Sequence, residues 1–186
     1  MIGYAFCGSF CTFGASFEAL SRLVSEGRKI QPIMSEAAYS TDTRFQSAKE
    51  FSAKVEELCG RKIIRTICEA EPLGPRTPLE ALIIAPCTGN TLAKLASGIT
   101  DTAVTMAAKA HLRSDRPLLI ALASNDAMSQ NLGNIARLLT RQSVYFVPMR
   151  QDDPEKKPHS LVADMGRVPE ALLEMEAKRQ IRPLFV

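Results

Sequence analysis

Short apolar runs alternate with stretches of helical periodicity along the 186-residue chain, and this alternation constrains the possible folds strongly. The apolar runs predict strands at residues 2–7, 29–34, 81–85, 117–123 and 144–147, with a weaker strand at 61–68. Strands that alternate with helices through short connections form βαβ units, which build a parallel sheet covered by helices on both faces. The sequence therefore predicts a single doubly wound α/β domain over residues 1–186, with three layers.

The expected helices lie between these strands, and several of them end at glycine. Apolar residues at helical spacing predict helices at about 13–26, 44–58, 91–97, 101–112, 129–140 and 168–179. Gly27, Gly60 and Gly98 follow three of these segments, as is typical of helix C-termini. Asp101 is expected to cap the helix that begins beside it. In the helix at 129–140, the side chains expected to point inward are Leu132, Ile135 and Leu139.

The remaining segments predict loops, and the composition excludes several classes of protein. Residues 8–12 and 35–43 are polar, 71–78 contain three prolines, and 151–158 are charged and bounded by proline. The 23 basic and 20 acidic residues are spread evenly and tryptophan is absent, so we expect no nucleic-acid partner. Because no run approaches the roughly 18 apolar residues of a membrane helix, and the uncharged residues 1–17 have no preceding basic residue, we expect neither membrane association nor a leader.

The cysteines favour a reducing compartment. The five cysteines lack CxxC spacing, and the chain has only two histidines to add to them. A zinc site is therefore not expected, and free thiols in a cytoplasmic protein are the simplest interpretation.

Polar turns follow four of the predicted strands, at the edge where doubly wound sheets bind ligands. In the first turn, Gly8 permits close approach of the backbone, and Ser9 and Thr12 offer hydroxyls at a helix start. This combination suits a phosphate, although serine and threonine there can also be simple helix caps. The second turn runs from Ser35 to Arg44. Arg44 either binds a carboxylate or phosphate or is solvated beside a capping Asp42 or Thr43.

The third and fourth turns follow the two most apolar strands. Residues 86–91 combine a flexible glycine with hydroxyl and amide groups at a helix N-terminus, which is more hydrogen-bonding capacity than a structural turn needs. Lys94, one helical turn later, either adds charge to this site or is solvated. Residues 123–128 again place amide and carboxylate groups after a buried strand, with Met128 expected to pack.

These two turns carry a resemblance to a known family. Residues 86–94, followed by Gly98 and Asp101, resemble the P-x-T-[AG]-N-T-x-A-K…G…D signature of the Rossmann-like or flavodoxin-like flavoproteins, which include FMN-binding decarboxylases and prenyltransferases. Gly8 and Ser9 resemble the first phosphate-binding loop of that family, and Asn125 and Met128 fall where its P-A-M-N-x-x-M motif lies. The resemblance implies FMN as a cofactor and a homo-oligomer that builds its site between subunits. The cofactor-binding candidates are Gly8, Ser9, Thr12, Ser35, Pro86, Thr88, Gly89, Asn90, Thr91, Ser124 and Asn125.

A narrower resemblance covers nearly the whole chain. Residues 41–45, 107–110, 145–148 and 151–164 are similar to the dipicolinate synthase B chains, and the loop at 151–164 is not shared by the decarboxylases. The resemblance implies a functional loop at 151–164, followed by a C-terminal helix and tail at 168–186. It also implies a partner A chain and the oxidation of dihydrodipicolinate to dipicolinate in the mother cell of a sporulating bacterium. A nicotinamide cofactor, NAD or NADP, is implied for the reaction and can be held by the A chain.

The implied chemistry selects further candidates. A ring with two carboxylates requires cationic groups or helix-terminal N–H donors, and Arg44, Lys156 and Lys157 are the substrate-binding candidates. Aromatisation releases a hydride and a proton, and the proton can pass to Asp42, Asp126 or His159. Two alternatives remain open. One is a free-standing FMN-dependent decarboxylase or prenyltransferase, and the other is a non-catalytic ligand-binding subunit.

Overall fold

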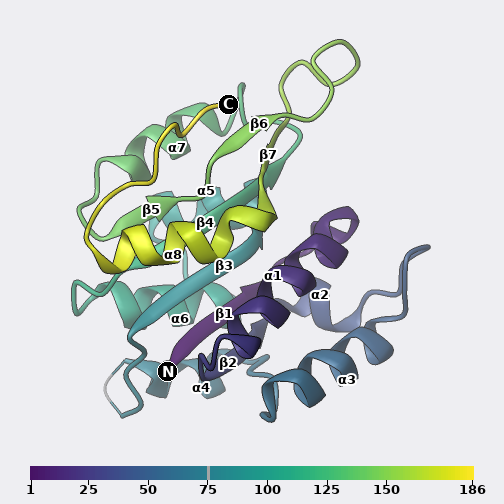
Figure 1. Cartoon of the computed structure of the whole chain (residues 1–186), viewed down its shortest axis with the longest axis vertical. Helices are drawn as coiled ribbons and strands as arrows, with labels where there is room; N and C mark the ends of the chain where they lie inside the picture. Colours follow the sequence, from purple (N-terminus) through teal and green to yellow (C-terminus); the bar gives the residue numbers. More distant parts are fainter. Residues whose placement is uncertain (75) are drawn as a thin grey trace.

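A parallel sheet with helices on both sides forms the centre of the molecule (Figure 1), in a computed structural model that describes residues 1–74 and 76–186. Its parallel strands are β1 (Ile2–Phe6), β2 (Ile30–Met34), β3 (Ala81–Cys87), β4 (Leu118–Ser124) and β5 (Val144–Phe146). They pair in the order β2-β1-β3-β4-β5. This is the flavodoxin-like order of a doubly wound sheet, so the predicted α/β fold is confirmed.

Two further strands form an antiparallel hairpin that the sequence patterns did not indicate. β6 (Met149–Gln151) pairs with β7 (Leu161–Ala163), and β7 pairs with the last two residues of β4, Ala123 and Ser124. Along the same edge of β4, β5 pairs with the first three residues, Leu118 to Ile120. The loop 152–160 of the hairpin therefore lies at the carboxyl end of the sheet, where it projects beyond β6 and β7 (Figure 1).

Helices cover both faces of the sheet. One face packs against α1 (Phe13–Ser25), α3 (Ala48–Cys59) and α8 (Val168–Glu176). The other packs against α5 (Gly89–Ser97), α6 (Ala103–Leu112) and α7 (Leu132–Leu139). Shorter helical segments connect these elements: η1 (Phe10–Thr12), α2 (Glu36–Ser40), α4 (Ile67–Ala70), η2 (Glu71–Leu73) and η3 (Met165–Arg167).

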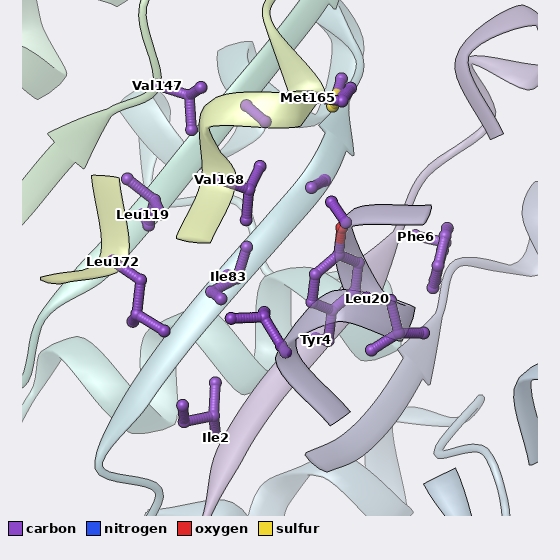
Figure 2. Close-up of a cluster of buried hydrophobic side chains, with 14 of the residues drawn as sticks. Ile2, Tyr4, Phe6, Leu20, Ile83, Leu119, Val147, Met165, Val168 and Leu172 are labelled. Atoms are coloured by element: carbon purple, nitrogen blue, oxygen red, sulfur yellow. The ribbon is translucent and has the colours of Figure 1, made fainter. Parts of the chain in front are cut away.

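Side-chain alternation along the central strands fills two separate cores. Tyr4 and Phe6 of β1 point to the face of α1 and α3, whereas Ala5 points to the opposite face. Figure 2 shows the first core, in which Ile83 and Leu119 continue the layer toward α8. Every residue of β3 and β4 is buried. Burial on both faces explains why these strands are uninterrupted apolar runs in the sequence.

The C-terminal segment covers the free edges of β5 and β6. The side-chain amide of Gln180 accepts a hydrogen bond from Phe146 N–H at 2.9 Å and donates one to the Phe146 carbonyl at 2.7 Å, as a neighbouring strand would. The Leu184 carbonyl accepts the N–H of Met149, and Val186 N–H donates to the Met149 carbonyl. β5 and β6 are thereby both supplied with partners.

Several sequence-based boundaries are wrong, and helix capping explains most of them. The weak strand predicted at 61–68 is reduced to a single bridge between Ile33 and Ile64, because Thr66 and Glu69 form a capping box that starts α4. The helix predicted from Arg44 begins only at Ala48, after the cap Ser47. α2 occupies much of the predicted turn at 35–43, where Ser35 accepts the Ala38 N–H.

Other corrections concern side chains and loops. Thr102, rather than Asp101, caps α6, and Leu132 is 50% exposed, with Ile135 and Leu138 as the buried residues of α7. Residues 71–73 of the predicted loop 71–78 form η2, and Pro75 lies outside the described residues. Gln151 belongs to β6 rather than to the predicted loop at 151–158. The last helix ends at Glu176 instead of continuing to 179.

Within residues 1–74 and 76–186, none of the helices combines the length and the apolarity that crossing a membrane requires.

Candidate functional site

A cavity of about 600 Å³ opens at the carboxyl end of the parallel sheet. Its lining comes from the turns after β1, β3 and β4, together with Phe45 and the β6–β7 hairpin. The volume falls within the roughly 300–1,000 Å³ of small-molecule sites. The position is the one at which doubly wound sheets bind their ligands.

The first turn presents backbone and hydroxyl groups at one side of the cavity. Its compact shape arises because the Ser9 carbonyl accepts the N–H of Thr12 at 3.1 Å and the Thr12 hydroxyl at 2.8 Å. Gly8 has little free space beside it, since a Cβ there would lie 3.3 Å from the Ala37 side chain. Ser9 and Thr12 both remain partly exposed in the cavity lining.

The third turn brings the N-terminus of α5 to the cavity. Thr88 caps the helix through its hydroxyl, which accepts the Thr91 N–H at 3.2 Å and donates to the Thr91 hydroxyl at 3.1 Å. Gly89 is buried as the first residue of the helix, and the amide of Asn90 is exposed to the cavity. The N–H groups and the positive end of the helix dipole favour an anion here.

The fourth turn carries the carboxylate of Asp126 at the edge of the cavity. The Ser124 hydroxyl donates to Oδ1 of Asp126, and Asn131 Nδ2 lies 2.9 Å from both carboxylate oxygens. These bonds, led by the one from Ser124, lower the pKa of the Asp126 carboxyl. Asp126 is therefore ionised at neutral pH. Asn125, next to it, is exposed and lines the cavity.

The outer wall of the cavity comes from segments away from the parallel strand ends. Asp152, Lys157, Ser160 and Val162 reach it from the β6–β7 hairpin, and Phe45 reaches it from the segment before α3. Lys157 is exposed and forms an ion pair with Asp152. The cavity therefore has an exposed cation at its outer wall, and its carboxylates are either paired with that cation or hydrogen-bonded within the fourth turn.

The structure brings together most of the candidates for cofactor binding. Eight of them line the cavity: Gly8, Ser9, Thr12, Thr88, Gly89, Asn90, Ser124 and Asn125. The other three support its walls without lining it. Ser35 caps α2, the Pro86 carbonyl accepts the Cys7 N–H, and Thr91 bonds to Thr88.

Only some of the candidates for substrate binding and proton transfer line the cavity. Lys157 and Asp126 line the cavity, whereas Asp42 accepts the Ala48 N–H at the start of α3 and lines a separate pocket of about 370 Å³. The Arg44 guanidinium lies 4.9 Å from the centre of the Phe45 ring. Lys156 and His159 are exposed on the hairpin loop, outside the cavity lining. Lys94, left open by the sequence, pairs with Asp101 at 2.7 Å.

Sequence reasoning missed several residues of this region. Phe10, Cys11, Phe45 and Ser160 line the cavity, and Asn131 anchors Asp126 from the start of α7. Phe10 and Cys11 lie inside the first turn, so the position of that turn was the available signal. Nothing in the local sequence distinguishes Asn131. In the described ranges, no three His, Cys, Asp or Glu side chains come together as a metal site would require.

Comparisons with known proteins agree with this geometry. The family model "Flavoprotein" matches residues 1–173. The dipicolinate synthase B chain of Bacillus subtilis is 42% identical over 185 residues, which cover 100% of this chain and 92% of that protein. The crystal structure of the dipicolinate synthase B chain from Bacillus halodurans has a TM-score of 0.91 and 37% identity, covering 100% and 95% of the two chains. The FMN-dependent cysteine decarboxylase SpaF shares the fold, with a TM-score of 0.68, 20% identity and coverage of 94% and 95%.

Proposed function

This chain belongs to the flavoprotein family and, within it, to the dipicolinate synthase B chains, and we propose that it acts with an A chain to oxidise dihydrodipicolinate to dipicolinate. The observation that carries the proposal is the 42% identity over the whole chain. The cavity at the carboxyl end of the sheet supports the proposal, because doubly wound sheets bind their ligands at this edge.

The residues of the cavity fit FMN. The N–H groups of α5 and the hydroxyls of Ser9 and Thr12 suit a phosphate, and the exposed amides of Asn90 and Asn125 suit the hydrogen-bonding edge of a flavin ring. Phe10, Phe45 and Val162 add apolar surface for the ring system. A bound flavin would supply a hydride acceptor. The decarboxylase of the same fold is named as FMN-dependent, which supports this assignment.

The substrate requires recognition of two carboxylates on a ring. Lys157 is the cation at the outer wall, and the α5 N-terminus offers N–H donors on the sheet side. These groups would hold the ring between the hairpin and the sheet and orient it toward the cofactor. Among the described residues that line the cavity, Lys157 is the single cation and cannot balance two carboxylates, so we propose that the A chain, or a second copy of this chain, completes the site.

The oxidation removes one hydride and one proton from the ring, and the hydride would pass to the oxidised nicotinamide cofactor, directly or through the bound flavin. A strong base at the cavity is not required because formation of the aromatic ring favours loss of the proton. We assign the nicotinamide cofactor, NAD or NADP, to the partner A chain. The lowered pKa of Asp126 makes its carboxylate a weak proton acceptor at neutral pH. We further propose that the reaction takes place in the cytoplasm of the mother cell.

Reconstitution tests this function. The purified chain is mixed with FMN and dialysed, its visible spectrum is recorded, and dipicolinate formation is then followed with the A chain, with and without each nicotinamide nucleotide. Retained flavin bands and oxidation that requires both chains are expected. Full oxidation by this chain alone would contradict the two-chain assignment. Release of carbon dioxide from a cysteinyl substrate would instead identify a free-standing decarboxylase.

A further inference from the structure

The carboxylate of Asp126 lies directly against the first residue of α5. A Cβ placed on Gly89 would lie 2.3 Å from Ser124 Oγ, 2.7 Å from Asp126 Oδ1 and 2.7 Å from Asn131 Nδ2. None of these atoms belongs to a long flexible side chain, so they cannot withdraw easily. Gly89 is therefore required for close approach of the turn after β4 and not for an unusual backbone conformation.

The polar cluster against Gly89 is fixed by several bonds of its own. Asn131 is 4% exposed and Ser124 is 9% exposed, and both donate to Asp126. The Asn134 amide donates to Asn131 Oδ1 at 2.9 Å, and the Asp126 carbonyl accepts the Asn131 N–H at 3.1 Å. Hydrogen bonds to an ionised carboxylate are roughly twice as strong as neutral ones, so this turn has one well-defined geometry.

We propose that Asp126 is a positioning residue that couples the turn after β4 to the first turn of α5 and thereby fixes Asn90 and Asn125 in the cavity wall. Asn90 follows Gly89 and Asn125 precedes Asp126, so the two cavity amides are direct neighbours of the two contacting residues. The spacing of these amides depends on the contact between Asp126 and Gly89. The negative charge also lies next to the positive end of α5, which favours the same arrangement.

This role differs from that of a proton acceptor at the same position, and an exchange of side chains separates the two. In Asp126→Asn, the remaining oxygen can still accept one hydrogen bond, but the NH2 group that replaces the other oxygen faces the Asn131 donor, so the contact of Asn131 with two carboxylate oxygens is lost. In the double variant Asp126→Asn/Asn131→Asp, the amide and the carboxylate change places, and the bond between positions 126 and 131 can re-form. A positioning role is restored by this exchange, whereas a proton acceptor at position 126 is not.

The test uses the full chain without ligand and then with FMN; only the choice of FMN as probe rests on the proposed function. Hydrogen exchange is measured at residues 89–91 and 124–131 in wild type, Asp126→Asn, the double exchange, Gly89→Ala and the control Gly133→Ala, whose Cβ would meet nothing within 4 Å. We expect Asp126→Asn and Gly89→Ala to raise exchange in both segments and to weaken FMN binding by at least about tenfold. The double exchange should recover both properties, and Gly133→Ala should resemble wild type.

Two outcomes would be decisive against the coupling. Unchanged exchange at residues 89–91 in both Asp126→Asn and Gly89→Ala would overturn it, as would a double exchange no better than the single variant. A wild-type chain that retains no FMN would contradict the proposed cofactor, while the exchange data would still decide whether Asp126 couples the two turns.

Discussion

The two walls of the cavity are built differently. The sheet wall consists of turns that follow β1, β3 and β4, so buried parallel strands fix the backbone at each turn. The outer wall consists of Phe45, which is 54% exposed, and of a hairpin whose strands have three residues each. Backbone held by a buried sheet defines what the cavity can bind. Substitutions in the exposed outer wall should cost little stability. We expect this wall to determine which ring-shaped substrate the cavity accepts.

The largest effect is expected from a substitution beneath the sheet wall. Phe6 is fully buried, and its ring centre lies 5.2 Å from that of Phe51 and 5.7 Å from that of Phe13. Phe6→Ala should lower the free energy of unfolding by about 3–5 kcal/mol, measured by urea denaturation. Val162→Ala in the outer wall should cost roughly 1 kcal/mol. Equal losses would remove the distinction between the walls.

A helix cap provides the next comparison. The hydroxyls of Thr88 and Ser47 each accept an N–H at 3.2 Å at the start of a helix, but only Thr88 lines the cavity. Thr88→Ala and Ser47→Ala should each reduce the free energy of unfolding by about 1 kcal/mol. Only Thr88→Ala should also weaken FMN binding in a fluorescence titration. If both variants weakened FMN binding, or if neither did, the proposed contribution of the Thr88 turn to this binding would be contradicted.

The outer wall should respond in ligand binding rather than in stability. Lys157 lines the cavity and its neighbour Lys156 does not, although both are exposed. Lys157→Gln and Lys156→Gln should each change the free energy of unfolding by less than about 0.5 kcal/mol. Calorimetric titration with dipicolinate should give weaker binding only for Lys157→Gln. Identical affinities would exclude Lys157 from recognition of the carboxylates.

The smallest expected effect is a loss of folding stability that appears only at acidic pH and is absent at neutral pH. His111 is 1% exposed, its Nε2 lies 2.8 Å from the Pro117 carbonyl, and burial lowers its pKa below the usual 6.5. The unfolded chain binds the proton first, so His111 contributes its full stability above pH 6.5 and loses it as the pH falls toward the lower, folded-state pKa. His111→Phe should flatten this loss in urea titrations at several pH values, and the exposed control His159→Phe should retain it.

The same contrast explains what the sequence could predict. The strands at 81–85 and 117–123 are long apolar runs because they are buried on both faces, and the polar turns after them were found by position alone. β6 and β7 are too short for a periodic pattern, and their pairing with each other and with β4 depends on residues distant in sequence. Chain pattern therefore predicts the sheet wall but misses the strands of the outer wall, for which only the family resemblance indicated Lys157 and the loop at 151–164.

Of the remaining errors in the sequence-based predictions, some could have been avoided from the local sequence and one could not. Ser47 with Glu50, and Thr66 with Glu69, both have the spacing of a capping box, and this spacing would have placed the starts of α3 and α4 correctly. Asn131 is different. Its role depends on a carboxylate and a glycine brought together by folding, and no pattern around it in the sequence indicates that contact.

The segment after α8 has a consequence for handling the protein. Gln180 satisfies the open edge of β5, and Leu184 and Val186 bond to Met149 of β6. Unpaired strand edges are templates for pairing between molecules, which leads to aggregation. Shortening the chain to residue 176 would expose both edges at once. We expect such a variant to precipitate on concentration, even though the segment removed contains none of the residues that line the cavity.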